Sequence, residues 1–230
     1  MAFDECTPYP CDKKYARKSM DLTHDWLVRC INRFKSTSSR YEYNQFLFPI
    51  VQGSVYADLR KQSAEIISNY DMPGNAIGGL SVGEPHDLMY EMCHEVCSIL
   101  PSEKPRYLMG VGTPSDILGA VKRGVDMFDC VLPTRSGRTG LAFTWQGRIN
   151  IKNNKYQTDN TPIDPACNNL NLNRYSKNYL NHLFNTNEIL ASMLLTLHNI
   201  NFYQELMASI RKNINEGTFD QFHDKYIDKL

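Results

Sequence analysis

Apolar and polar positions alternate in blocks over the first 133 residues of the chain. Short apolar runs end in glycine or an acid, and the first four are each followed by a segment with helical period or helix-start residues. The last of these helices opens with Thr113, a capping residue, and Pro114 at its first position. This alternation predicts parallel strands covered by helices, an α/β architecture. The predicted strands are 2–6, 46–54, 75–83, 106–112 and 125–133, and the predicted helices are 13–35, 54–70, 85–99 and 114–124.

The pattern changes after Pro133. The segment LAFTWQGRINIKN, residues 141–153, alternates like a β-hairpin around Gln146 and Gly147. An asparagine-rich loop follows it, and two or three helices are predicted between about 174 and 228.

Polar residues and glycines fall toward the carboxyl ends of the five predicted strands. A (β/α)₈ TIM barrel assembles its active site from such positions, and an open doubly wound sheet is the alternative. The pattern favours the barrel. Because five strands are predicted where eight are needed, and Met1 directly precedes the first strand, we expect an N-terminally truncated barrel. The strand-end residues are Asp4, Gln52, Gly79, Gly110 and Asp129.

Composition narrows the class of protein. The chain has 230 residues, is 42% hydrophobic and has a formal net charge of zero, which predicts a globular protein with a sizeable core. It contains no apolar run of about 18 residues, and its N-terminus lacks the pattern of a signal peptide. We therefore expect a cytoplasmic protein without membrane insertion, in which the seven cysteines are reduced thiols.

One segment of this neutral chain is locally basic. Between Cys130 and Thr158 there are five basic residues and no acid, interleaved with Phe143, Trp145 and Tyr156. Such a segment predicts RNA binding through charge and stacking, and a solvated hairpin is the alternative. The basic residues are Arg135, Arg138, Arg148, Lys152 and Lys155.

Several motifs carry a resemblance to a known family. They are FDECTPYP, QGS, GGLSVGE, YLMGVGTPSDI, MFDCVLPTRSGR and HNINFY, and they occur in order over the whole chain. In these motifs the chain resembles the bacterial tRNA-guanine transglycosylases, or queuine tRNA-ribosyltransferases, over about their C-terminal three fifths. The resemblance implies a (β/α)₈ barrel with a zinc-binding helical subdomain near its end. The parts then expected are 1–133 with base pocket and nucleophile, 134–198 with hairpin, RNA-binding segment and degenerate zinc subdomain, and 199–230 with the C-terminal helices.

The resemblance implies that Asp129 is the nucleophile. Its carboxylate attacks the ribose C1′ at the wobble guanosine of a G-U-N anticodon, expels guanine and holds the tRNA covalently until a new base enters. That base is 7-aminomethyl-7-deazaguanine, in the biosynthesis of queuosine. Without the resemblance, an aspartate here more often caps a turn before Pro133.

The purine pocket follows residue by residue from the same resemblance. Asp4 accepts hydrogen bonds from the amine edge of the purine, Gln52 and the Gly79 amide donate to its carbonyl, and Leu80 offers its own carbonyl to a substrate amine. Met109 packs on the face of the purine. Taken alone, Met109 is more often a core residue and Gly79 a turn.

Four further residues complete the implied pocket. Cys6 and Val82 fit the bacterial form with its small incoming base, and Gly110 lies beside the base. Glu84 reads the aminomethyl group, although an isolated glutamate in VGEP is more often a helix N-terminal acid. In the basic segment, Arg135 and Arg138 hold the anticodon loop, and Lys152 and Lys155 contribute to RNA binding.

The metal site departs from the family pattern. The family carries Cys-x-Cys-x-x-Cys and a distant histidine, the four ligands of a structural zinc. Here Cys167 and His198 occupy two of these positions, but Asn169 and Leu172 occupy the others. Two ligands do not make a closed zinc site, so we expect the chain to purify without stoichiometric zinc.

The family's N-terminal part lies outside the resemblance. It supplies the first strands of the barrel, an Asp-Ser-Gly-Gly-Phe loop whose aspartate acts as general base, and an aromatic that covers the purine. Three explanations are open: a separately encoded N-terminal half as partner, a decaying gene remnant, or a fragment of a longer protein. The resemblance also implies a homodimer. The alternative interpretation of function is an inactive remnant or a noncatalytic subunit that binds tRNA or a partner.

Overall fold

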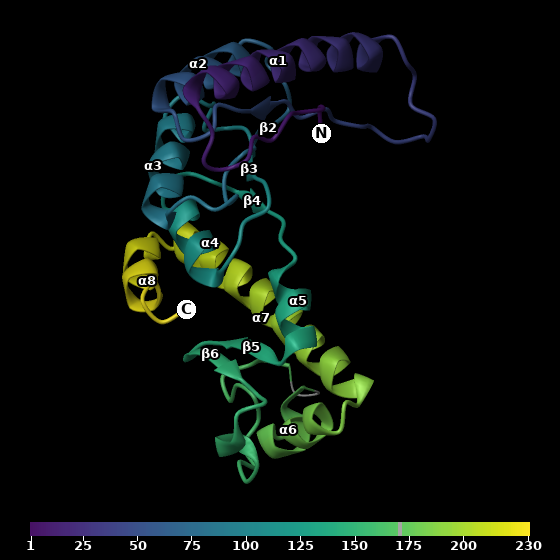
Figure 1. Ribbon diagram of the computed structural model, residues 1–230, viewed down its shortest axis with the longest axis vertical. Helices are drawn as coiled ribbons and strands as arrows, with labels where there is room; N and C mark the ends of the chain where they lie inside the picture. The colour runs from purple at the N-terminus through teal and green to yellow at the C-terminus, as the bar shows by residue number, and fades with distance from the viewer. Residues whose placement is uncertain (170–171) are drawn as a thin grey trace. The chain divides into compact units, whose positions relative to one another are not determined.

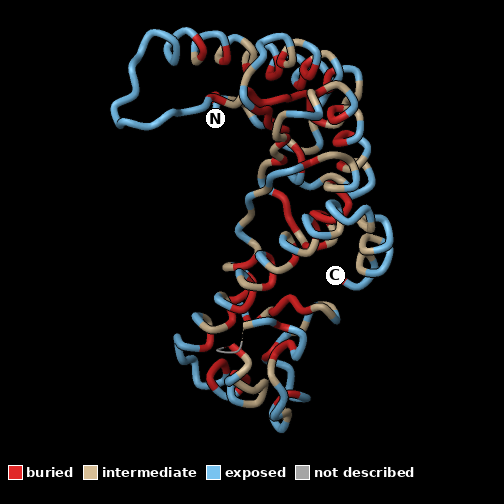
Figure 2. Tube along the Cα trace, turned by 180° about the vertical axis from the view of Figure 1, so that it is seen from behind, coloured by how far each residue is buried: buried red, intermediate tan, exposed pale blue. Residues whose placement is uncertain are grey.

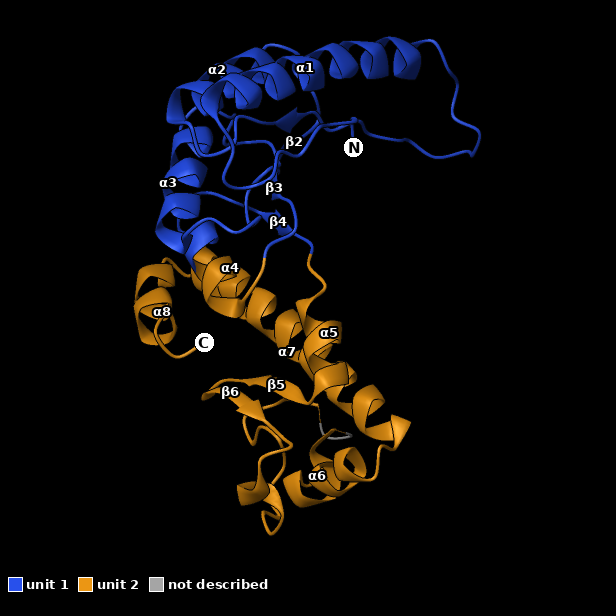
Figure 3. Ribbon diagram, viewed as in Figure 1, with its two compact units in different colours: residues 1–111, 119–129 blue, residues 112–118, 130–230 orange. Residues whose placement is uncertain are grey.

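The computed structural model describes residues 1–169 and 172–230. The chain divides into two compact units, one of residues 1–111 and 119–129 and the other of residues 112–118 and 130–230 (Figure 3). No helix in the described part of the chain is long and apolar enough to cross a membrane.

The first unit is built on a four-stranded parallel sheet with its strands in chain order. Val51 pairs with Ile77, and Leu108 pairs with Phe128, so neighbouring strands run in register along the sheet (Figure 1). The parallel sheet with helices between its strands confirms the predicted α/β class. The elements are α1 (Lys13–Lys35), β1 (Ile50–Val51), α2 (Ala57–Ser68), β2 (Asn75–Ile77), α3 (His86–Cys97), β3 (Arg106–Leu108) and β4 (Met127–Phe128). Helix α4 (Pro114–Val121) begins in the second unit and ends in the first.

Side chains at the helix starts explain where α1 and α4 begin. Asp12 Oδ1 accepts a hydrogen bond from Tyr15 N at 2.9 Å and caps α1. Thr113 Oγ1 accepts from Asp116 N at 3.2 Å, while Asp116 Oδ2 accepts from Thr113 N at 3.0 Å. This reciprocal pair is a capping box, and it confirms the helix start predicted at Thr113.

The core of the first unit lies between the sheet and its helices. Val51, Ile77 and Leu108 come from three successive strands and are fully buried, together with Ile67 of α2 and Val96 of α3. Figure 2 shows these buried segments in red. Successive residues of β1 and β2 are all buried, so both faces of these strands are covered, which explains why they read as continuous apolar runs.

The prediction of a strand over residues 2–6 is wrong. Among the described residues this segment gives the sheet one backbone hydrogen bond, from Ala2 N to Phe48 O at 2.8 Å. One bond does not make a ladder, so the sheet has four strands rather than five. The segment nevertheless lies along β1 and brings Asp4 to the sheet.

The second unit combines a β-hairpin with helices. The predicted hairpin is confirmed, with Phe143 opposite Arg148, and the predicted C-terminal helices number three. The sequence interpretation did not foresee α5. Gly137 lets this helix approach α7, since a Cβ atom there would lie 2.6 Å from Thr196 Cα. The elements are α5 (Leu132–Thr139), β5 (Leu141–Thr144), β6 (Gly147–Asn150), η1 (Asn154–Tyr156), η2 (Leu172–Arg174), α6 (Lys177–Asn185), α7 (Ile189–Asn215) and α8 (Phe219–Tyr226).

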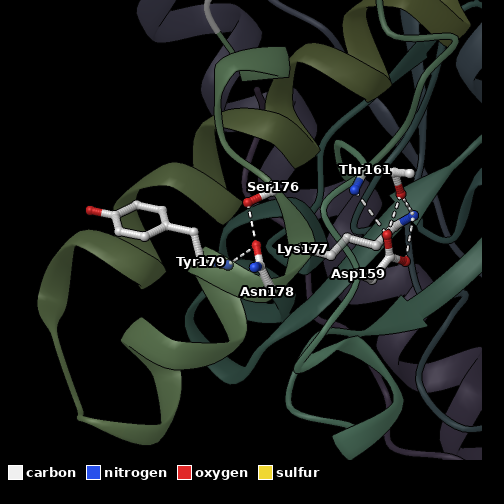
Figure 4. Close-up of polar contacts among 6 residues, drawn as sticks. All are labelled: Asp159, Thr161, Ser176, Lys177, Asn178 and Tyr179. Carbon is white, nitrogen blue, oxygen red and sulfur yellow. Dashed lines mark hydrogen bonds and ion pairs between the residues drawn. The ribbon is translucent and has the colours of Figure 1, made fainter.

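Polar contacts join the loop before η2 to the start of α6 (Figure 4). Asp159 Oδ1 accepts from Thr161 N at 2.9 Å, and Lys177 Nζ lies 3.4 Å from Asp159 Oδ2. A β-bridge between Pro162 and Ser176 lies beside them. The loop is therefore tied to α6 by hydrogen bonds and one partly buried ion pair.

Candidate active site

The candidate site lies where the strands of the parallel sheet end. Gln52 follows β1, Gly79 comes two residues after β2, Gly110 two residues after β3, and Asp129 directly follows β4. Because parallel strands end at the same edge of a sheet, these residues gather along one edge, as the sequence predicted.

Asp129 is held by two donors on one oxygen. Its Oδ1 accepts from Tyr107 Oη at 2.6 Å and from Gly110 N at 2.9 Å. Among the described residues no donor reaches Oδ2, and the side chain is exposed. One oxygen of the carboxylate is therefore anchored, while the other is left open to solvent.

Tyr107 is a site residue that sequence reasoning missed. Burial, together with the hydrogen bond to Asp129, raises the pKa of Tyr107 to about 12, so the phenol remains a hydrogen-bond donor at neutral pH. The sequence offered one signal, because Tyr107 lies in the predicted strand 106–112. In the structure, Tyr107 on β3 pairs with Met127, two residues before Asp129. A residue on the neighbouring strand at that register reaches the carboxylate.

A second polar cluster lies at the ends of β1 and β2. Gln52 Nε2 donates to Asp4 Oδ2 at 2.7 Å. A Cβ atom at Gly78 would lie 2.8 Å from Gln52 Nε2 and 3.2 Å from Asp4 Oδ2, so only glycine allows this approach. Gln52 is 1% exposed, and within the described residues its Oε1 has no partner. An unpaired buried polar atom of this kind points to a missing ligand.

Cys6 and Gly79 adjoin this cluster. Burial and the nearby Asp4 charge raise the pKa of the Cys6 thiol, against a smaller lowering by the Gly79 backbone amide. Gly79 adopts φ +65°, a left-handed conformation that favours glycine. The structure thus brings Asp4, Cys6, Gln52 and Gly79 together, as expected from the resemblance.

The loop after β2 is organised by Glu84. One carboxylate oxygen accepts from Val82 N at 2.9 Å and the other accepts from Ser81 N. Leu80 is buried, whereas Val82 is 38% exposed. Glu84 therefore holds the loop backbone, and it precedes the first residue of α3 by two positions.

Met109 also lies at a strand end. Its amide donates to Ile77 O at 3.1 Å, and its side chain is half-buried. This places the side chain beside the ends of β2 and β3, next to Gly110.

The basic residues between Cys130 and Thr158 lie in the second unit, and their side chains are all exposed. Arg135 and Arg138 lie on α5. The expectation of stacking surfaces is wrong for Phe143, which is 2% exposed, and for Tyr156, which is 7% exposed, because both rings pack in the core of this unit. The exposed basic side chains are Arg135, Arg138, Arg148, Lys152 and Lys155.

The expected zinc position holds a hydrogen-bonded cluster instead of four ligands. Cys167 Sγ accepts from Asn201 Nδ2 at 3.4 Å and from Asn169 N at 3.5 Å. Glu205 Oε1 accepts from Asn168 N at 2.9 Å and from Asn201 Nδ2 at 2.7 Å. Amide N–H groups donate to the sulfur and to the carboxylate, and their partial positive charges disfavour a cation at this position.

The other two zinc positions do not favour a metal either. Leu172 is buried and has no ligating atom, and His198 Nε2 lies 2.9 Å from Phe143 O. In residues 1–169 and 172–230, no three His, Cys, Asp or Glu side chains are grouped to hold a metal ion. The residues present therefore do not fit the structural zinc site of the family that the sequence resembles.

Fold and site together define an α/β protein whose parallel strands end in an anchored carboxylate and a polar cluster. The family model described as Queuine tRNA-ribosyltransferase matches residues 1–230, and the chain belongs to this family. The chain is 51% identical to the queuine tRNA-ribosyltransferase of Zymomonas mobilis over 96% of its length, and 49% identical to that of Herpetosiphon aurantiacus over all of it. Identity to the Aquifex aeolicus protein is 48% over the whole chain.

The chain is shorter than these relatives. It covers 57% of the Zymomonas mobilis and Herpetosiphon aurantiacus proteins and 60% of the Aquifex aeolicus protein. The comparison thus confirms the family and the span of about three fifths that the motifs indicated.

Proposed function

We propose that this chain carries the nucleophile and purine pocket of a tRNA-guanine transglycosylase, a pentosyltransferase that replaces the wobble guanine of tRNA by 7-aminomethyl-7-deazaguanine in queuosine biosynthesis. The observation that carries the proposal is the anchored carboxylate of Asp129 in a chain of this family. Its substrate is a tRNA with a G-U-N anticodon, which places the reaction in the cytoplasm.

In the proposed first step, Asp129 Oδ2 attacks C1′ of the wobble ribose. The C1′–N9 electron pair leaves with guanine, which takes up a proton, and an ester joins the aspartate to the RNA. Tyr107 and the Gly110 amide keep the carboxylate oriented. In the second step, N9 of the incoming base attacks C1′ and loses its proton, so the carboxylate is released.

The purine lies in the cluster at the ends of β1 and β2. Asp4 accepts from the amine edge of the base, while Gln52 and the Gly79 amide donate to its carbonyl. The proximity of Asp4 and Gln52 supports this placement, since Gln52 Nε2 binds Asp4 with one N–H and has a second N–H to donate. The other proposed contacts are Leu80 through its carbonyl, Met109 on the purine face, Gly110 beside it, and Cys6, Val82 and Glu84 toward the 7-substituent.

The RNA contacts and the rest of the barrel complete the proposal. Arg135, Arg138, Lys152 and Lys155 bind the anticodon stem-loop through its phosphates. The four-stranded sheet is closed into a (β/α)₈ barrel by strands outside this chain, supplied by an N-terminal half. Membership of this family also supports a homodimer as a further assembly.

The test of the proposal is covalent trapping of tRNA. In an assembly that exchanges guanine, Asp129→Asn abolishes the protein–RNA adduct on a denaturing gel and lowers turnover by roughly three orders of magnitude or more. Asp126→Asn is the matched control, since Asp126 lies three residues away and accepts a hydrogen bond from Arg106 N. An adduct that persists in Asp129→Asn would assign the nucleophile to another residue.

A second candidate function is a noncatalytic tRNA-binding or partner-binding subunit. The hydrogen-bonded cluster at Cys167, which stands where the family has zinc ligands, favours it. Incorporation of radiolabelled guanine into tRNA separates the two functions, because only the enzyme exchanges the base.

A further inference from the structure

Arg60 on α2 is a fully buried cation in the first unit. Within residues 1–169 and 172–230, its hydrogen bonds all go to backbone carbonyls, and none goes to a carboxylate. The bonds are Nε to Ser54 O at 2.6 Å, Nη1 to Val51 O at 3.2 Å and to Gly78 O at 2.6 Å, and Nη2 to Gly79 O at 2.9 Å.

A buried guanidinium is costly for stability, because the charge loses its hydration. Burial lowers the pKa of Arg60 to about 10, and the group is still protonated at neutral pH. The fork of the guanidinium reaches the segments that follow both β1 and β2. It therefore ties together the two strand ends that carry Gln52 and Gly79.

One of these bonds acts on a particular peptide group. Gly78 C=O and Gly79 N–H belong to the same planar peptide unit. A charged donor on the carbonyl oxygen polarises the unit and makes its N–H a stronger donor. The bond to Gly79 O also holds Gly79 in its left-handed conformation. Arg60 thus determines both the direction and the strength of the Gly79 N–H.

We propose that Arg60 is a positioning residue for recognition of the purine carbonyl: through the Gly78–Gly79 peptide it strengthens the hydrogen bond to the 6-oxygen and selects 6-oxopurines. This inference rests on the proposed function, in which the Gly79 amide donates to that oxygen. It explains why a charge is buried beneath the pocket, where an apolar side chain would pack without the cost of desolvation.

The test compares two bases that differ at position 6. Guanine has the 6-oxygen, whereas 2-aminopurine lacks it and keeps the amine. In calorimetric titrations of the chain together with the polypeptide that supplies the other barrel strands, Arg60→Lys weakens guanine binding about tenfold, the size expected for one charge-assisted hydrogen bond, and changes 2-aminopurine binding less than about twofold. The affinity ratio of the two bases is the readout, because a purely structural role lowers both affinities alike.

Arg106→Lys is the matched control. Arg106 is also a buried arginine of the first unit that donates to backbone carbonyls, Leu100 O at 2.6 Å and Gly124 O at 3.2 Å, but it lies at the amino end of β3. The guanine to 2-aminopurine ratio stays unchanged in this variant. Its melting temperature shows how far loss of a buried guanidinium affects folding alone.

Each outcome decides the inference. An unchanged ratio in Arg60→Lys, with or without loss of both affinities, overturns it. If that variant does not fold, Arg60→Gln and the wild-type guanidinium ¹⁵N resonances take its place: the Arg60 resonances shift with guanine and not with 2-aminopurine. If the wild-type chain together with that polypeptide binds neither base, the proposed function fails first and the inference falls with it. Guanine binding with an unchanged ratio refutes the inference alone.

Discussion

At the scale of single residues, the site is an arrangement of donors around carboxylates. Asp129 receives two hydrogen bonds on one oxygen, and Asp4 receives one from Gln52. Each donor comes from a different segment of chain than its acceptor. The orientation of both carboxylates therefore depends on the sheet, and a small change in one donor should alter the chemistry without unfolding the protein.

Tyr107→Phe tests this orientation. The variant keeps the ring and removes the donor to Asp129 Oδ1. In an assembly that exchanges guanine, we expect kcat to fall about tenfold, the value of one hydrogen bond to a charged group, with the melting temperature little changed. Tyr70→Phe is the control, because Tyr70 is 37% exposed at the end of α2. An undiminished kcat in Tyr107→Phe would show that the Gly110 amide alone orients the carboxylate.

At the scale of elements, α1 and α2 meet through a buried polar contact. His24 Nε2 lies 2.8 Å from Ser63 Oγ, which also accepts from Gln52 N at 3.1 Å. Burial lowers the pKa of His24, and the charges of Asp21 and Asp25 only partly oppose this. The contact links the two helices to the backbone at the pocket.

This contact predicts a pH dependence of stability. Since the pKa of His24 is lower in the folded chain, the unfolded chain binds more protons below about pH 6.5. The contribution is fully present above the unfolded pKa and is lost as the pH falls toward the folded value. Denaturant titrations from pH 8 to pH 5 should show stability falling below about pH 6.5, and less steeply in His24→Gln. Equal slopes would assign the acid sensitivity to other groups.

The cluster around Cys167 predicts the outcome of restoring the family's ligands. Wild-type protein should purify with less than about one tenth of an equivalent of zinc, because two ligands are too few. Asn169→Cys with Leu172→Cys should bring the content to about one equivalent by elemental analysis. The same double variant with Cys167→Ser is the control and should lose the metal. Nearly one equivalent in the wild-type chain would show that the ligands lie elsewhere, with Cys130 and His182 as the next candidates.

At the scale of the whole molecule, the sheet of the first unit is open among the described residues. Its edge strands are β1 and β4. Met127 on β4 is 44% exposed, and Phe3, in the segment beside β1, is 75% exposed. An open parallel sheet exposes unpaired backbone groups and apolar side chains. These edges are where the strands of an N-terminal half would pair.

We expect the isolated 230-residue chain to elute as an oligomer or aggregate and to show no guanine exchange. A polypeptide with the preceding strands of the family and their aspartate should restore both solubility and exchange. Asp129→Asn is the control, since it should regain solubility with the added polypeptide but not exchange. Size-exclusion chromatography with radiolabelled guanine measures both properties. A monodisperse chain that exchanges guanine unaided would contradict the requirement for those strands.

The sequence by itself determined the local elements and their class. Helix α1 begins and ends at the predicted residues, and the predicted capping at Thr113 is present, because period and caps are local properties. The strand ends with Gln52, Gly79 and Asp129 were also predictable, since an apolar run followed by a polar residue or glycine is visible in one dimension.

Only the tertiary structure decided which residues meet. Tyr107 reaches Asp129 because β3 and β4 pair in one register, and Arg60 reaches Gly78 and Gly79 because α2 packs under two strand ends. Segment 2–6 is not a strand, because it makes too few backbone hydrogen bonds to the neighbouring segment. These outcomes depend on contacts between residues 18 to 48 positions apart, and such contacts leave no periodic signal in the sequence.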